Sequence, residues 1–384
     1  MRILHVIPSL DPATGGPMEI VRVLLDYGPE DCTQEVVTLD DPNAGFLREF
    51  GFPVHALGPR NSVYGRNKKL IPWLKANRGR FDGVVVHAMW LYTDYAVWRT
   101  MRGHVPYVVF PHGMLDPYFK RAFPLKHLKK WLYWLPVEYW VLRGARRVLF
   151  TCEAEAELAK HSFWLHHWNA SVTPFGTIPP EGDPERQREA FFGACTAVRG
   201  KRFVLFLGRI DRKKGCDLLV DAFVKLAARE PELDLVMAGP DPKNWQAELV
   251  RGACLASGAA GVAKRIHWPG MLRGDAKWGA FHAAEVFALP SHQENFGIAV
   301  AEALACGKPV LLSDKVNIAA EIAADGAGLM EDDTGAGTER LLERWVNLPA
   351  AEREAMAVRA RDCFRRRYDM RENAKTVVKT VVGC

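Results

Sequence analysis

Short apolar runs alternate along this chain with longer segments in which apolar residues recur every three or four positions. The short runs are typical of buried parallel strands, and the longer segments are typical of helices that cover a sheet. The pattern therefore predicts an α/β fold with parallel sheets. Strands are expected near residues 2–7, 33–39, 53–56, 82–88, 106–110 and 146–150, and then near 203–207, 233–238, 265–268, 285–289, 309–312 and 327–330.

This alternation is interrupted once, between residues 174 and 202. Proline and glycine gather in the run from Pro174 to Pro184, and a charged stretch follows. Such clusters mark connecting segments, and a chain of 384 residues is long enough for two domains with separate cores. We predict a first domain over residues 1–178, a linker over 179–200 and a second domain over 201–369.

One segment in the second half carries the most chemical information. Its apolar run 285–290 indicates a buried strand, and residues 296–306 indicate a helix that ends at Gly307, with Pro309 just beyond. Glu294 would then lie in the loop that joins the strand to the helix. A loop of this kind stands at the carboxyl end of a parallel strand, where open α/β sheets bind their ligands.

The beginning of that helix is suited to a bound anion. Backbone N–H groups at a helix start lack partners within the helix, and the helix dipole favours a negative group such as a diphosphate. The residues that offer these groups are Asn295, Phe296, Gly297 and Ile298. Glu302, two turns further on, could reach a ribose hydroxyl, and Glu294 could bind sugar hydroxyls. The spacing predicts a pocket for a nucleotide sugar.

The segment from Glu294 to Glu302 resembles the glutamate, seven residues, glutamate motif of retaining glycosyltransferases with the GT-B fold, family 4 in particular. The run from Phe203 to Gly215 resembles the other donor signature of this family. The resemblance implies that Arg209 and Lys214 contact the diphosphate of the donor. Two cations in that place favour the reaction, because the departing diphosphate gains negative charge as the glycosidic bond breaks.

The resemblance also implies the overall architecture and the donor. It implies two facing Rossmann-like domains with the active site in the cleft between them, and a final helix over 370–384 that packs back on the first domain. The donor would be a UDP- or GDP-sugar. The glycine loop at Gly15 and Gly16 resembles the loop where family members bring backbone close to the donor. Met271 would lie where backbone contacts the base.

Two histidines of the first half follow predicted strands directly. His112 comes after the strand Tyr107–Phe110, and its position matches the one where family members place a histidine near the donor sugar. His87 ends the apolar run that begins at Val84 and is a candidate for the acceptor side. A lone histidine is more often structural than catalytic, so both assignments stay hypotheses.

The mechanism implied by the resemblance is transfer with retention of the anomeric configuration. These motifs place no enzymic nucleophile, which favours substitution on the same face of the sugar over a double displacement. No Asp-x-Asp triplet ends a suitable strand, and the acidic run Glu331-Asp332-Asp333 is typical of a surface turn. We expect catalysis without a metal ion or another cofactor.

Composition places the protein among ordinary globular proteins, with 48% hydrophobic and 25% charged residues. The first residues lack the pattern of a signal peptide, and no apolar stretch is long enough to span a bilayer. The eight cysteines show no paired short spacing, so free buried thiols are expected. These features predict a cytoplasmic protein, and attachment to the inner face of the cell membrane is a further hypothesis.

The segment 118–135 is both basic and aromatic. Such a composition suits contact with an anionic membrane surface. Alternatively, Trp131 and Trp134 pack inside the first domain while the lysines are solvated. The formal net charge of +6 is compatible with either interpretation. Nucleic acid is not an expected partner, because the basic residues match no reading motif.

The sequence favours a glycosyltransferase that extends a glycan or a polyprenyl-linked acceptor, as in the synthesis of a cell-surface polysaccharide. Two places depart from the family pattern, the junction at Phe175-Gly176-Thr177 and the tail at Tyr368-Asp369-Met370. A nucleotide-sugar epimerase of GT-B fold and a non-catalytic sugar-nucleotide binding protein remain alternatives, because one fold hosts many functions. A phosphorylase is disfavoured, since no pyridoxal-phosphate lysine signature is found. A dinucleotide dehydrogenase is disfavoured because the first loop lacks Gly-x-Gly-x-x-Gly.

Overall fold

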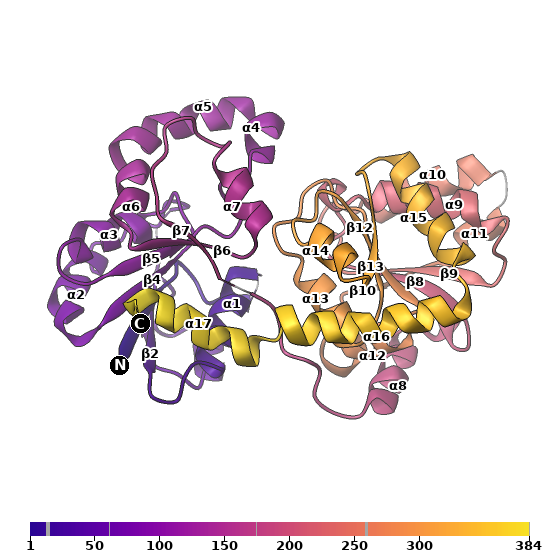
Figure 1. Ribbon diagram of the computed structural model, residues 1–384, viewed down its shortest axis with the longest axis horizontal. Helices are drawn as coiled ribbons and strands as arrows, with labels where there is room; N and C mark the ends of the chain where they lie inside the picture. The colour runs from indigo at the N-terminus through magenta and orange to yellow at the C-terminus, as the bar shows by residue number, and fades with distance from the viewer. Residues whose placement is uncertain (13–15, 61, 174, 258–259, 384) are drawn as a thin grey trace. The chain divides into compact units, whose positions relative to one another are not determined.

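The computed structural model describes residues 1–12, 16–60, 62–173, 175–257 and 260–383. The chain forms two compact units, one made of Met1–Gly176 with Met370–Cys384 and the other of Thr177–Asp369 (Figure 1). Each unit has a single sheet in which all neighbouring strands are parallel. The prediction of two α/β domains with parallel sheets is confirmed.

The sheet of the first unit has seven strands in the order β3-β2-β1-β4-β5-β6-β7. The central strands β1, β4 and β5 are almost entirely buried, since helices cover both faces of the sheet. The strands are β1 Arg2–Val6, β2 Thr33–Thr38, β3 Val54–Ala56, β4 Gly83–His87, β5 Tyr107–Phe110, β6 Arg147–Phe150 and β7 Ala170–Val172.

The helices of the first unit include the last helix of the chain. Helix α17 packs against α1 and β4, and a Cβ atom at Gly83 would collide with the Val381 side chain, so glycine lets the helix approach the strand. The helices are α1 Gly16–Asp26, α2 Leu70–Asn77, α3 Tyr92–Met101, α4 Tyr118–Ala122, α5 Pro124–Tyr133, α6 Tyr139–Gly144, α7 Glu153–Ala159 and α17 Met370–Val382, with the short turns η2 Gly45–Glu49, η3 Arg78–Arg80 and η4 Trp134–Glu138.

The sheet of the second unit has six strands in the order β10-β9-β8-β11-β12-β13. The strands are β8 Arg202–Leu207, β9 Leu233–Ala238, β10 Ile266–Gly270, β11 Val286–Leu289, β12 Val310–Ser313 and β13 Gly328–Glu331. The helices are α8 Pro184–Ala194, α9 Cys216–Ala227, α10 Gln246–Ser257, α11 Ala260–Ala263, α12 Gly274–Ala283, α13 Ile298–Ala305, α14 Ala319–Ala324, α15 Gly335–Asn347 and α16 Ala350–Arg367, with the short turns η5 Thr196–Val198 and η6 Arg212–Lys214.

Most of the segment predicted as a linker, 179–200, is folded structure of the second unit. Asp183 caps the helix α8, and Phe191 on that helix is fully buried. The helix packs closely against α12, where a Cβ atom at Gly279 would collide with the Gln187 carbonyl. The dense charges of this stretch hid an amphipathic helix whose start at Asp183-Pro184 has the usual cap chemistry.

Two other elements differ from the sequence expectations. The edge strand β7 was not predicted, because it has only three residues, all partly or fully exposed. The basic and aromatic segment 118–135 divides into α4 and α5 at Phe123, followed by the π-helical turn η4, a division that the sequence did not predict. A proline at the first position of α5 favours this restart.

Candidate functional site

In each unit the chain reverses its direction of winding at one point of the sheet. In the second unit this point lies between β8 and β11. From β8 the chain adds β9 and β10 on one side, and it then crosses to the other side of β8 and adds β11, β12 and β13. Ligands of open α/β sheets bind at the carboxyl ends of the strands at such a point. The two donor motifs of the sequence form the loops that follow these two strands.

Two hydrogen bonds to the backbone carbonyl of Lys213 join these loops. The His292 N–H and the Ser291 hydroxyl donate to the Lys213 carbonyl at 2.9 and 2.8 Å. Gly215 has a φ of 66°, and a Cβ atom there would collide with the Pro290 carbonyl. Glycine is therefore required at this position, both for its left-handed backbone and for the close approach of the loops.

Lys214 and Glu294, both predicted site residues, form an ion pair across these loops. Their side chains are largely buried, 19% and 14% exposed. Burial lowers the pKa of Lys214 to about 8, and the nearby charges of Lys213 and Arg209 act in the same direction. The Glu294 carboxylate favours the protonated lysine. The site therefore holds a cation at neutral pH, with little water around it.

Arg209 follows β8 directly and has an exposed side chain. The charge of Arg209 lowers the pKa of Lys214, which means that the two side chains lie near each other. In the part of the chain that the structure describes, no acidic side chain forms an ion pair with Arg209. The structure thus brings Arg209 and Lys214 to the same edge of the sheet and leaves the guanidinium open to a ligand.

The loop around Glu294 is joined through its backbone to the loop that follows β12. The Glu294 N–H donates to the Lys315 carbonyl at 3.0 Å, and its carbonyl accepts from the Asn317 N–H at 3.1 Å. Asn295 is joined to the same neighbouring loop, since its Oδ1 accepts from the Asn317 amide at 3.4 Å. The loop is therefore held from two sides before the helix begins.

Helix α13 begins at Ile298, two residues later than predicted, after Gly297 in a left-handed conformation with a φ of 78°. The Phe296 ring is buried and packs edge-on against Tyr368 with centroids 5.7 Å apart. The side chain of Phe296 therefore belongs to the core, and only its backbone can contact a donor. The helix still starts at the predicted loop, where its first N–H groups lack helical partners.

Glu302 lies on the second turn of α13 and pairs with Lys277 of α12 at 2.7 Å. The Lys277 ammonium also lies 4.3 Å from the centre of the Trp278 ring. The two predicted carboxylates thus have one lysine each, Lys214 for Glu294 and Lys277 for Glu302. Sequence reasoning missed Lys277, because it lies 25 positions from Glu302 and only the folded chain brings the two together.

Met271 follows β10 and is 57% exposed. Three glycines bring the neighbouring strand ends close together, as the Gly208 N–H donates to Ala238 at 2.9 Å and the Gly239 N–H to Gly270 at 2.8 Å. A Cβ atom at Gly239 would collide with the Gly208 carbonyl. The backbone at these strand ends is therefore tightly packed, and the Met271 side chain extends into solvent.

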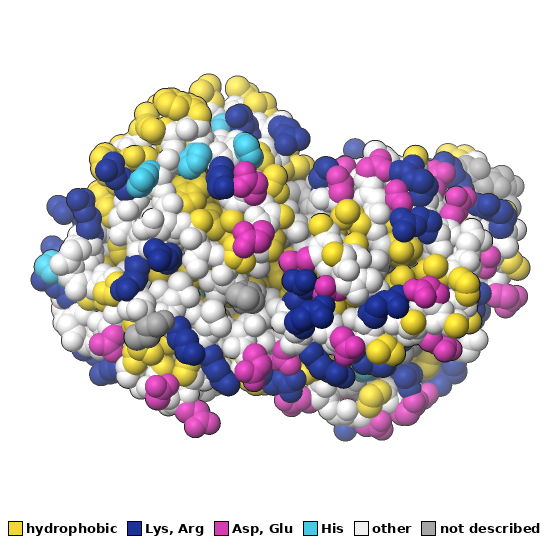
Figure 2. Space-filling model, viewed as in Figure 1, with side chains coloured by type: hydrophobic (Ala, Val, Ile, Leu, Met, Phe, Trp, Pro, Cys, Tyr) yellow, Lys and Arg dark blue, Asp and Glu magenta, His cyan; other side chains and the backbone are white. Residues whose placement is uncertain are grey.

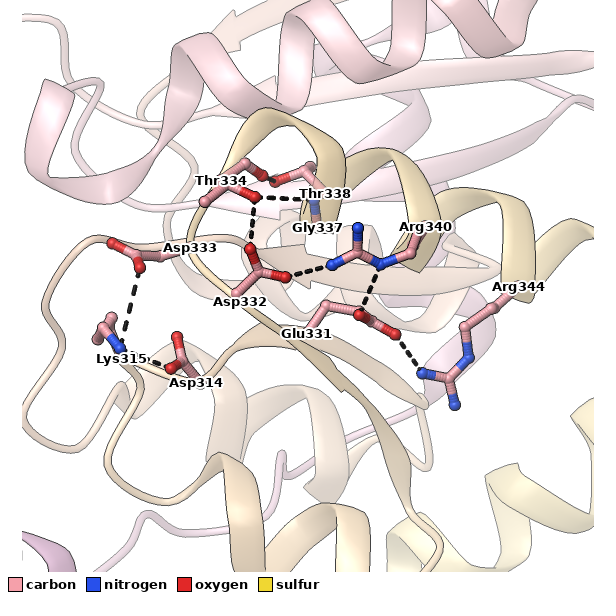
Figure 3. A network of polar contacts seen from close by, with 10 residues as sticks. All are labelled: Asp314, Lys315, Glu331, Asp332, Asp333, Thr334, Gly337, Thr338, Arg340 and Arg344. Atoms are coloured by element: carbon pink, nitrogen blue, oxygen red, sulfur yellow. Dashed lines mark hydrogen bonds and ion pairs between the residues drawn. The ribbon is translucent and has the colours of Figure 1, made fainter.

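The acidic run after β13 is engaged in surface ion pairs, as Figure 3 shows. Glu331 pairs with Arg340 at 2.9 Å and with Arg344 at 2.6 Å, while Asp333 accepts from His292 at 3.0 Å. Among the described residues, no group of three or more His, Cys, Asp or Glu side chains has the arrangement of a metal site. The described helices also include none with the length and apolarity to cross a membrane.

In the first unit the corresponding reversal lies between β1 and β4. His5 of β1, His87 at the end of β4 and His112 after β5 stand there side by side, and they are joined by hydrogen bonds. His5 Nδ1 lies 3.0 Å from His87 Nε2, and His87 Nδ1 lies 3.2 Å from His112 Nε2. The rings stack at 5.3 and 5.4 Å between centroids. The two predicted histidines thus belong to a row of three.

All three imidazoles favour their neutral forms. Burial lowers the pKa of His5 to about 4 and that of His112 to about 3. The pKa of His87 also falls well below its ordinary value, through burial and then the neighbouring His5 and His112. His112 has a φ of 50°, and its Nδ1 is buried with no hydrogen-bond partner among the described residues. Of the two predicted glycines, Gly16 begins α1, and Gly15 lies outside the described residues.

The helices α4 and α5 of the first unit line a cavity of about 390 Å³. Its walls are mainly aromatic and apolar, with two lysines at the side; they include Trp90, Met114, Phe119, Phe123, Lys126 and Lys130. The Lys130 ammonium lies 4.3 Å from the centre of the Trp90 ring, and burial, with the charge of Lys126, lowers its pKa to about 8. The cavity thus combines apolar walls with positive charge.

Between residues 124 and 138, leucines are exposed, whereas Trp131 and Trp134 pack against the core of the first unit. Trp134 is fully buried and stacks on Phe163 at 4.1 Å, and Trp131 packs edge-on against the same ring at 5.0 Å. Between 48% and 81% of the surface is exposed at Leu125, Leu128, Leu132 and Leu135. Figure 2 shows hydrophobic side chains gathered on the surface of this part of the first unit.

Two family models match the chain. The family model described as "Glycosyl transferase 4-like domain" matches residues 18–176, and that described as "Glycosyl transferases group 1" matches residues 187–362. Together they extend over both units. The chain therefore belongs to the family 4 type of glycosyltransferases, whose fold is GT-B.

Curated relatives match part of the chain. D-inositol 3-phosphate glycosyltransferase of Paenarthrobacter aurescens is 29% identical over 203 residues, which are 50% of this chain and 46% of the relative. Mannosylfructose-phosphate synthase of Agrobacterium fabrum is 32% identical over 147 residues, which are 35% of this chain and 32% of the relative. The chain thus aligns with less than half the length of these two relatives.

Solved structures match the whole fold. Sucrose-phosphate synthase of Thermosynechococcus elongatus has a TM-score of 0.74 at 19% identity, over 98% of this chain and 97% of the other. Anabaena HepE in complex with UDP and glucose has a TM-score of 0.74 at 18% identity, over 100% of both chains. At these identities the likeness shows the GT-B fold of the chain.

Proposed function

We propose that the protein is a retaining glycosyltransferase that moves a sugar from a nucleoside-diphosphate sugar to a glycan or lipid-linked acceptor. The observation that carries the proposal is the buried Lys214–Glu294 ion pair beside the open guanidinium of Arg209, at the point where the second sheet reverses. One site there offers cations for a diphosphate and a carboxylate for sugar hydroxyls. The complexes of HepE with UDP and with UDP-glucose support a uridine donor.

Each predicted residue has a role in this proposal. Arg209 and Lys214 bind the diphosphate together with the start of α13, while Glu294 accepts hydrogen bonds from the transferred sugar. Glu302, held by Lys277 at 2.7 Å, binds the ribose. Backbone near Met271, at the carboxyl end of β10, binds the base. In the first unit, His112 contacts the donor sugar, and His87 acts through it.

The reaction in this proposal needs no enzymic nucleophile. The bond from the anomeric carbon to the diphosphate oxygen breaks, and its electron pair stays with the diphosphate. The acceptor hydroxyl attacks the same face and loses its proton to a diphosphate oxygen. Arg209 and Lys214 stabilise the charge that develops on the leaving group, a role that a divalent metal has in other transferases. Metal-free transfer is therefore part of the proposal.

The acceptor is proposed to approach from a membrane surface. The exposed leucines of α5 and the lysines beside them form an amphipathic face suited to anionic lipid. The adjoining cavity, apolar with Lys126 and Lys130 at its side, fits the phosphate and isoprenoid part of a polyprenyl-linked acceptor. Such a protein acts at the inner face of the cell membrane in the assembly of a surface polysaccharide.

A turnover assay tests this function. The full chain is incubated with UDP-, GDP- and ADP-sugars, with and without a polyprenyl-phosphate-linked glycan, in the presence of EDTA. Release of one nucleoside diphosphate together with a longer glycan is expected. Conversion of the sugar nucleotide without an acceptor would indicate an epimerase instead. Binding without any turnover would indicate a sugar-nucleotide binding protein.

A further inference from the structure

Among the buried polar groups of the first unit, one chain of contacts extends beyond the predicted residues. His5 Nε2 lies 2.9 Å from Gln34 Oε1, and from His5 the row continues through His87 to His112. We infer that Gln34 fixes the proton positions along this row, so that His112 is held as a hydrogen-bond acceptor for a hydroxyl of the donor sugar. The inference rests on the proposed function, because it needs His112 at the sugar.

The Gln34 amide is the fixed end of the row. Its Nε2 donates to the Leu24 carbonyl at 3.2 Å, so its Oε1 must face His5. An oxygen there can only accept. His5 therefore carries its proton on Nε2. Since His5 is neutral, its Nδ1 has a lone pair and no proton.

The same alternation of donor and acceptor nitrogens continues from His5 to His87 and His112. Because His5 Nδ1 is an acceptor, the proton in its 3.0 Å contact belongs to His87 Nε2. His87 Nδ1 is then an acceptor as well, and His112 Nε2 donates across the 3.2 Å contact. Each imidazole can donate from one nitrogen only while it is neutral. All three histidines are therefore Nε2–H tautomers, and their direction is set by Gln34.

At the free end the row leaves one acceptor without a donor. His112 Nδ1 is buried and has no partner among the described residues. A buried polar atom without a hydrogen bond is destabilising, and such atoms mark places where a water molecule or a ligand binds. A sugar hydroxyl supplies the donor that this nitrogen lacks. His5, His87 and Gln34 are then positioning residues for His112.

The tautomers can be measured without any substrate. The full chain is labelled with ¹⁵N-histidine, and long-range ¹H–¹⁵N spectra are recorded at pH 7.5. The three resonances are assigned by their loss in His5→Phe, His87→Phe and His112→Phe. We expect the Nε2–H pattern for all three rings. An Nδ1–H pattern or an imidazolium at any one of them overturns the inference, whether or not the protein is a transferase.

A second experiment removes the fixed end. Gln34→Met keeps the volume of the side chain but not its oxygen acceptor, so His112 should show a substantial Nδ1–H population in the same spectra. A His112 signal that stays purely Nε2–H in this variant contradicts the role of Gln34. Thr100→Val is the matched control, since Thr100 is buried in the same unit and hydrogen-bonds only within its own helix.

Kinetics with the active donor then test the contact with the sugar. Gln34→Met should reduce kcat/KM about tenfold, which is the effect of one neutral hydrogen bond. In the wild type, one donor analogue that lacks a single sugar hydroxyl should also lose about tenfold in kcat/KM. With that analogue, Gln34→Met should reduce kcat/KM little further. Additive losses for every deoxy analogue would show that His112 contacts no hydroxyl of the sugar.

Discussion

The reversal points of the two sheets have the same topology but opposite electrostatic character. In the second unit the strand ends carry the ion pairs Lys214–Glu294 and Lys277–Glu302 and the open cation Arg209. In the first unit they carry a row of three neutral imidazoles. Under the proposed function, a charged edge suits a diphosphate and a neutral edge suits uncharged hydroxyls.

Burial explains why the two edges differ. A buried charge is tolerated only with a partner, and each lysine of the second site has a carboxylate beside it. The histidines have no acidic partner in their row, so they remain neutral and satisfy one another through hydrogen bonds. The predictions below test this contrast.

The largest expected effect is on the charged edge. Lys214→Ala, Arg209→Ala and Glu294→Ala should each reduce transfer by roughly 100-fold or more, the scale of a lost transition-state contact. Lys225→Ala is the control, since Lys225 forms a similar ion pair with Glu339 at 2.5 Å on the exposed side of α9. Near-normal kcat/KM in the three site variants would exclude this edge as the donor site.

The second prediction concerns Gly215, where the two donor loops approach each other closely. Gly215→Ala should destabilise the protein by at least about 1–2 kcal/mol, because alanine is strained at positive φ and its Cβ atom would collide with Pro290. Donor binding should weaken with it. Gly193→Ala, in open space on α8, should instead be neutral or stabilising by up to about 1 kcal/mol. Urea denaturation measures the free energy of unfolding of both variants. Equal values would show that the close approach of the two loops does not require Gly215.

The neutral histidines at the strand ends of the first sheet should make the protein less stable in acid. The histidines have lowered pKa values in the folded state, so they bind protons more readily when unfolded, and stability falls as pH drops below about 6.5. Between pH 6.5 and 5, His5 and His112 should each contribute a loss of about 1.6 kcal/mol. His87→Asn should show a smaller loss than the wild type in urea denaturation at these two pH values. Identical slopes would mean that these imidazoles are protonated in the fold.

The smallest predicted effect concerns a buried carboxyl pair of the first unit. Burial and then Asp94 raise the pKa of Glu138 well above its ordinary value, and burial raises that of Asp94 to about 6. A raised carboxyl pKa means that stability is lost as pH rises. Glu138→Gln, which resembles the protonated acid, should stabilise the protein by on the order of 1 kcal/mol at pH 8 and by less at pH 5. A gain that does not grow with pH would contradict this.

The sequence predicted much of the fold because buried parallel strands are nearly continuous apolar runs. Twelve strands were expected, and the described residues form thirteen. The missing strand, β7, lies at an edge and has no such run. The helix α8 was missed because its buried face holds few apolar residues, and the close packing at Gly279 is invisible in a local pattern.

The site was predictable only where its residues are near in sequence to a strand end. Glu294, Arg209 and Lys214 follow strands β11 and β8, but nothing in the sequence shows that Lys214 and Glu294 pair, since 80 positions separate them. Gln34 and His5 were missed for the same reason. They lie in β2 and β1, and only the register of the sheet places them in the row.

Binding of nucleoside diphosphates tests the central claim most directly. Thermal unfolding of the wild type, Lys214→Ala and Lys225→Ala is followed with UDP, GDP and ADP in the presence of EDTA. We predict that one of these three nucleotides stabilises the wild type and Lys225→Ala by about 2.7 kcal/mol at 100 times its dissociation constant, and that Lys214→Ala loses this effect. Equal stabilisation of all three proteins, or of none, would contradict a donor site at the Lys214–Glu294 pair.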